Sequence, residues 1–95
     1  MAEMKRELSV PPDVEEHGGT EILRLFISGG AMSLSMQRAF AEPGAWGRLL
    51  AELAQQAAEI YARETTIPAA EAMAEIRIAL DSALDQIESG LRPKN

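Results

Sequence analysis

Two adjacent glycines, Gly29 and Gly30, separate two apolar segments and constrain the fold more than any other feature of the sequence. The preceding segment, EILRLFIS, is rich in β-branched and aromatic residues, and the following one, AMSLSMQ, alternates apolar with small polar residues. This alternation is typical of β-strands. Two glycines between such segments favour a two-residue turn, because that turn needs positive φ at both central positions. The sequence therefore predicts an antiparallel β-hairpin with strands at about residues 21–28 and 31–37.

A turn at Gly29-Gly30 also fixes the register of the two strands. Ser28 then faces Ala31, and the pairs continue outward to Leu23 and Met36. One face, which we call the apolar face, carries Leu23, Leu25, Ile27, Met32, Leu34 and Met36. The opposite face, which we call the outer face, carries Ile22, Arg24, Phe26, Ser28, Ala31, Ser33, Ser35 and Gln37. A slip of one residue would move every side chain of a strand to the other face, so this register is strongly specified.

Two amphipathic helices are predicted after the hairpin, at about residues 43–63 and 68–90. Pro43 and Pro68 suit the first position of a helix, where a missing N–H costs nothing. Apolar residues then recur at steps of three and four, which indicates one apolar stripe on each helix. The stripes comprise Trp46, Leu49, Leu50, Leu53, Ala57, Ile60 and Tyr61, and then Ala69, Met73, Ile76, Leu80, Ala83, Leu84, Ile87 and Leu91. The predicted fold class is α+β in the order β-β-α-α, with both helices packed on the apolar face.

Residues 1–20 are expected to form a flexible or partly docked N-terminal arm of extended or irregular chain, because VPPDVEEHGGT combines prolines, glycines and acids. Residues 21–92 are expected to form a single α+β domain, and residues 93–95 a short tail. An isolated two-stranded sheet is marginal in water. Two ways of completing it remain open: Leu8 to Val10 adds a third strand, or a second subunit pairs with the hairpin.

The overall composition excludes several classes of function. The net charge is −6 and Lys5-Arg6 is the only basic pair, so binding to nucleic acid or to an anionic membrane is not expected. The absence of cysteine excludes disulfides, thiolate chemistry and cysteine-based zinc sites. The N-terminal residues lack the apolar region of a signal peptide, and no run approaches the ~18 apolar residues that span a membrane. A cytoplasmic location is therefore expected.

Three clusters have residue types found in catalytic or ligand-binding sites, and a structural explanation fits each of them better. The glycine pair leads into a strand and has no lysine nearby, whereas a P-loop needs a lysine at the start of a helix. His17, with Glu15 and Glu16, lies on an arm that does not preorganise a metal site. The acidic residues of the last helix lie outside its apolar stripe, with no histidine on a facing helix; they are Glu71, Glu75, Asp81 and Asp85. No catalytic residue, cofactor or metal is predicted, and an enzyme is disfavoured.

The outer face of the hairpin holds the predicted interaction residues, which are Ile22, Arg24, Phe26, Ser33 and Ser35. An arginine among hydroxyls is suited to an anion or a protein partner, although the same residues also make an ordinary polar sheet face. The leading hypothesis is a small acidic non-catalytic interaction or accessory protein. It would form a homodimer through a hairpin edge or the outer face, and it would bind a further, unidentified protein. The alternative is a regulatory domain for a small ligand, in which Arg24 or Arg38 holds an anion.

Residues 21–62 resemble a family of short, mainly alphaproteobacterial proteins catalogued as a domain of unknown function. The similarity rests on EILR at residues 21–24 with Phe26, and on FAEPGAWGRLLAELA at residues 40–54. Its most specific part is the combination of Pro43, Trp46 and Gly47. The resemblance implies a compact α+β domain and brings no activity with it.

Overall fold

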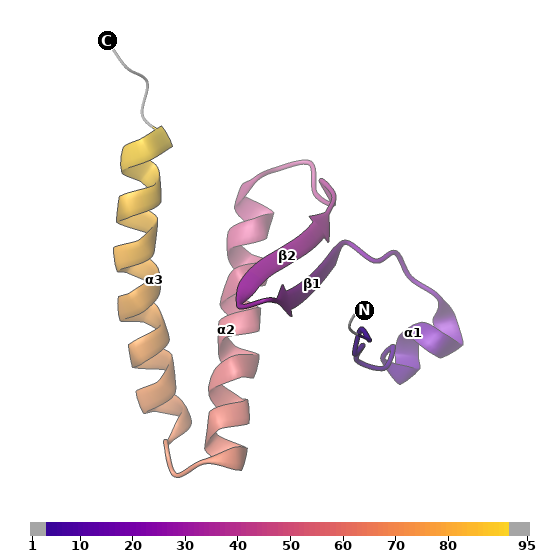
Figure 1. Ribbon diagram of the computed structural model, residues 1–95, viewed down its shortest axis with the longest axis horizontal. Helices are drawn as coiled ribbons and strands as arrows, with labels where there is room; N and C mark the ends of the chain where they lie inside the picture. The colour runs from indigo at the N-terminus through magenta and orange to yellow at the C-terminus, as the bar shows by residue number, and fades with distance from the viewer. Residues whose placement is uncertain (1–3, 92–95) are drawn as a thin grey trace. The chain divides into compact units, whose positions relative to one another are not determined.

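The computed structural model describes residues 4–91, and the chain divides into two compact units, Met1–Ala39 and Phe40–Asn95. We call them the hairpin unit and the helical unit. The elements are α1 (Pro12–His17), β1 (Leu23–Ser28), β2 (Ala31–Met36), α2 (Gly44–Glu64) and α3 (Ala69–Leu91), as Figure 1 shows. The predicted α+β class and the order β-β-α-α are confirmed. The single domain over residues 21–92 stays a prediction, and the predicted tail at residues 93–95 lies outside the described residues.

The hairpin has the predicted register. β1 and β2 pair antiparallel from Leu23–Met36 to Ser28–Ala31. Gly29 and Gly30 have φ angles of 59° and 80°, which are the positive values that the predicted turn requires. The backbone N–H of Gln37 donates to the carbonyl of Ile22 at 3.1 Å, so the ladder continues one pair beyond the strands. Within residues 4–91 the sheet has two strands, and Leu8 to Val10 do not add a third.

The turn predicts a measurable cost for a branched residue at Gly30. A Cβ at this position would have no neighbour within 4 Å, so the cost comes from the backbone alone. Gly30→Val is expected to lower the free energy of unfolding by about 1–2 kcal/mol, because a branched residue is strained at positive φ. Gly30→Asn should cost clearly less, since asparagine tolerates this region. Denaturant titration compares the two variants, and equal stabilities would contradict the turn geometry.

The arm contains a short helix, α1, where the sequence analysis expected irregular chain. That expectation was wrong because proline and glycine act here as start and stop signals. Pro12 occupies the first turn, and Asp13 and Glu15 place negative charge at the helix N-terminus, where it is favourable. Gly18 has a φ of 78° and donates its N–H to the carbonyl of Val14 at 2.7 Å, which ends the helix.

In the helical unit, α2 and α3 lie side by side as a helical hairpin and contact each other (Figure 1). Their bounds agree with the predicted helices to within one residue. Ala58 of α2 and Ala72 of α3 are the buried residues, and neither belonged to the predicted stripes. Small side chains suit places where two helices approach closely. Many large stripe residues stay exposed, among them Leu50, Leu53, Ile60, Leu80, Leu84 and Ile87.

The connection between α2 and α3 is ordered by Thr65. Its hydroxyl donates to the carbonyl of Tyr61 at 2.6 Å and accepts the N–H of Ile67 at 3.0 Å. Thr65→Val removes both hydrogen bonds and is expected to lower the free energy of unfolding by about 1 kcal/mol. Thr65→Ser keeps the hydroxyl and should stay close to wild type. If thermal or denaturant unfolding shows the same stability for Thr65→Val and Thr65→Ser, the hydroxyl of Thr65 does not stabilise this turn.

An aromatic pair lies at the start of α2. The ring centroids of Phe40 and Trp46 are 5.5 Å apart with an interplanar angle of 78°, an edge-to-face arrangement. Both side chains are half-buried. The backbone N–H of Trp46 donates to the backbone carbonyl of Pro43 at 3.0 Å, so the first turn of the helix positions the residue that carries the indole. Phe40 and Trp46, which both belong to the segment that carried the family resemblance, therefore pack against each other at the beginning of α2.

Candidate interaction surface

Considered by itself, the hairpin unit leaves its apolar face exposed. Its exposed fractions are 51% for Leu25, 74% for Ile27, 64% for Met32, 40% for Leu34 and 54% for Met36. Any neighbour can only reduce such values, so the hairpin unit considered alone exposes at least this much. Contiguous exposed apolar surface on a small protein marks a site of interaction. The residues predicted as the core side of the hairpin are thus the leading candidates for an interaction surface.

The outer face carries all five predicted interaction residues. The register places Arg24 opposite Ser35 and Phe26 opposite Ser33, and Ile22 continues the same face. Ile22 and Phe26 are half-buried, whereas Arg24 and the two serines are exposed. The structure brings these side chains together as predicted. Their role in binding a partner stays a prediction.

Arg24 is paired with two carboxylates. Its Nε lies 3.2 Å from Oε2 of Glu21, and its Nη1 lies 3.0 Å from Oε2 of Glu7 in the arm. The hydrogen bond and charge of Glu21, with a smaller contribution from Glu7, raise the pKa of Arg24 above its usual value. The pairing with Glu7 spans 17 positions of sequence and was not predicted. Since two carboxylates already balance the guanidinium, Arg24 is less suited to hold a ligand anion.

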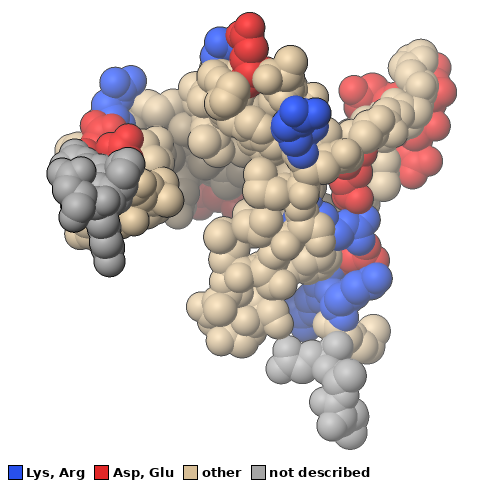
Figure 2. All heavy atoms as spheres, turned by 90° about the horizontal axis from the view of Figure 1, so that it is seen from above, with Lys and Arg blue, Asp and Glu red and all other residues tan. Residues whose placement is uncertain are grey.

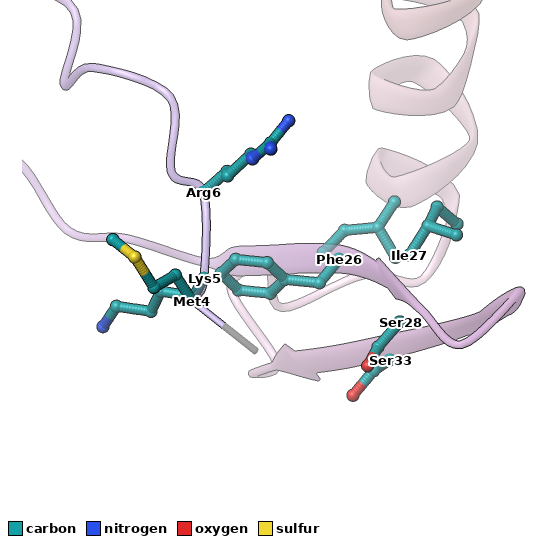
Figure 3. Close-up of a pocket in the computed structure, with 8 residues that line it drawn as sticks. Met4, Lys5, Arg6, Phe26, Ile27, Ser28 and Ser33 are labelled. Carbon is teal, nitrogen blue, oxygen red and sulfur yellow. The ribbon is translucent and has the colours of Figure 1, made fainter. Parts of the chain in front are cut away.

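Phe26 lines an open hollow of about 1110 Å³ between the arm and the hairpin. Figure 3 shows its ring directed toward Met4 and Lys5 of the arm. The remaining lining residues are Arg6, Leu25, Ile27, Ser28 and Ser33. Ligand sites usually combine an enclosed pocket with a few well-placed polar groups. The polar residues that line this hollow are all exposed, and no polar side chain among residues 4–91 is buried, so the hollow is not an enclosed site of this kind.

The histidine and the acidic residues that the sequence offered as possible metal ligands lie exposed in the described part of the chain. His17 Nε2 lies 3.9 Å from Oε2 of Glu16, and both side chains are largely exposed. No group of three potential metal ligands occurs within residues 4–91. The acidic residues of α3, which are Glu71, Glu75, Asp81 and Asp85, are all exposed. Figure 2 shows charged side chains in separate groups with uncharged surface between them.

The described helices include none that combines the length and the apolarity needed to cross a membrane. This finding concerns residues 4–91 and agrees with the absence of long apolar runs in the sequence.

Comparison with known proteins identifies the family. Residues 7–87 match the family described as domain of unknown function DUF5076. A solved structure from the photosynthetic bacterium Rhodopseudomonas palustris, provisionally named a pyruvate dehydrogenase, is 34% identical, with a TM-score of 0.72 over 97% of this chain and 89% of that chain. No curated protein matches. The resemblance to a domain of unknown function is confirmed, and the chain belongs to the DUF5076 family.

Proposed function

We propose that this protein is a non-catalytic interaction protein that acts as a homodimer. The observation that carries the proposal is the open apolar face of the hairpin. Ordering a residue costs about 1–2 kcal/mol of conformational entropy, and burying a large apolar side chain returns about 1.5–3 kcal/mol. In the described residues only Ala58 and Ala72 are buried, so each of the two units, taken by itself, needs further apolar burial.

A second copy is a suitable source of that burial. The sequence predicts that α2 and α3 cover the apolar face of the hairpin. Such packing would still leave both edges of the hairpin open. Open edges and apolar side chains on the same two strands favour pairing with another hairpin. Small domains often gain stability in this way. The outer face, with Phe26 and Arg24, would then remain available for a different protein.

Two alternative functions have less support. The name of the Rhodopseudomonas relative describes a dehydrogenase, and catalysis of that kind requires acid–base or nucleophilic groups positioned around a pocket. In residues 4–91, His17 lies exposed on α1 and the hollow at Phe26 holds no buried polar group. A regulatory anion site at Arg24 is disfavoured because Glu7 and Glu21 already pair with it.

Sedimentation over a wide range of protein concentration tests the proposal. We expect a species of twice the 10.3 kDa subunit mass, and a melting temperature that rises with concentration, because dimerisation stabilises the folded subunits by mass action. A monomer at the highest concentration, with a melting temperature independent of concentration, would contradict the homodimer.

A further inference from the structure

The two strands of the hairpin differ in how well they are protected. β1 is flanked by the arm, through the pairing of Glu7 with Arg24 and through a second hollow, distinct from the one described above, that residues of the arm and of β1 line together. β2, with the sequence AMSLSM, is exposed at all six residues and contains no charge and no proline. Natural proteins usually protect edge strands with charges, prolines or a covering segment. β2 therefore offers the edge that is open to another strand.

The hydrogen bonds of the hairpin show which backbone groups of β2 are free. Gln37 donates its N–H to Ile22, so its backbone groups point toward β1. In an antiparallel pair these directions alternate from residue to residue. The N–H and C=O groups of Met32, Leu34 and Met36 consequently point away from β1. Within residues 4–91 none of these groups has a backbone partner.

These three residues make β2 complementary to itself. They also carry the apolar side chains, so one register satisfies both the backbone and the side chains. In an antiparallel pair of β2 strands centred on Leu34, Leu34 meets Leu34 of the partner subunit and Met32 meets Met36 of the partner subunit. A one-residue slip would place apolar side chains beside serines. Because β2 has no charged residue, the net charge of −6 adds no direct like-charge pair here.

We propose that two copies pair through their β2 edges, with a two-fold axis at Leu34, to form a four-stranded antiparallel sheet in the order β1-β2-β2-β1. This inference rests on the proposed homodimer and names its interface. The apolar faces of both hairpins become one continuous surface, which is large enough for helices to cover. The occupant of the β2 edge is a second copy of this chain.

Cross-linking of single-cysteine variants tests the interface, since the natural chain contains no cysteine. Leu34→Cys brings two thiols to paired positions about 5.5 Å apart at Cα, within the range of a disulfide. Leu25→Cys is the matched control, because Leu25 lies opposite Leu34 on the same face and is more exposed. In the proposed sheet the two copies of residue 25 would lie on the outer β1 strands, with their Cα atoms about 15 Å apart.

With mild oxidation or a short bifunctional thiol reagent, we expect at least about tenfold faster dimer formation by Leu34→Cys, because paired thiols react at a millimolar effective concentration. Equal rates for both variants in a protein that sediments as a dimer would overturn the β2 interface and leave the homodimer intact. A protein that sediments as a monomer would overturn both.

The register has a separate test on the exposed outer face, where substitutions disturb folding least. A mixture of Ser33→Cys and Ser35→Cys should form mixed disulfide dimers faster than either variant alone, because Ser33 faces Ser35 of the partner subunit at about 4.5 Å between Cα atoms. Cross-linking in the mixture at the rate of the single variants would overturn the register centred on Leu34.

Discussion

Replacing Trp46 with alanine is expected to lower the free energy of unfolding by about 2–3 kcal/mol, somewhat less than is usual for a fully buried aromatic residue. Trp46 is half-buried, and its ring meets Phe40 edge to face at 5.5 Å. The substitution removes the edge-to-face contact with Phe40 at the beginning of α2. Denaturant titration followed by far-ultraviolet circular dichroism measures the change.

Ile78→Ala provides the matched control, because Ile78 is 70% exposed on α3 and lies off the apolar stripe. Its stability should stay within about 0.5 kcal/mol of wild type. A double-mutant cycle with Phe40→Ala should show a coupling energy of about 0.5–1.5 kcal/mol between the two rings. Additive effects of the two substitutions would contradict a stabilising edge-to-face contact.

Leu34→Asp is expected to weaken the proposed dimer at least about 100-fold, since two leucines leave the interface and burial of a large apolar side chain contributes about 1.5–3 kcal/mol. The substitution acts twice because Leu34 lies on the proposed two-fold axis. It also places two negative charges opposite each other, which is unfavourable in a sheet. Sedimentation equilibrium measures the dissociation constant.

Leu25→Asp is the control for this substitution, because it puts the same charge on the same face at the position opposite Leu34. It should weaken the dimer much less, since its two copies do not meet. Circular dichroism checks that both variants keep their secondary structure. An equal loss of affinity in the two variants would place the dimer contact on the apolar face as a whole, which contradicts an interface at the β2 edge.

The hairpin could be predicted from sequence because its determinants are local. Gly29 and Gly30 fix the turn, and a period of two then assigns each side chain to a face. The short helix α1 carried local signals too, with a proline at its start, acids in the first turn and Gly18 at its end. Their interpretation as irregular chain gave too much weight to the content of proline and glycine.

Other features depend on tertiary contacts and were not accessible to sequence patterns. The apolar stripe of a helix is recognised in the sequence mainly by its large side chains. Ala58 and Ala72 are buried because two helices meet there, which the sequence pattern does not reveal. The five predicted interaction residues lie on the outer face as predicted, since the register alone determines which residues share that face. The partner of Arg24 was missed because Glu7 lies 17 residues away in the arm, and no local pattern links them.

The exposed pairing of Glu7 with Arg24 gives the two sides of the hairpin opposite responses to ionic strength. Both side chains are almost half exposed, at 43% for Glu7 and 46% for Arg24. Dissolved salt therefore screens their attraction and loosens the arm from β1. The β2 edge contains no charge, and salt weakens the repulsion between two chains of net charge −6. A rise in salt concentration is therefore expected to release the arm while it favours association of the proposed dimer, and the two events can be separated in one titration.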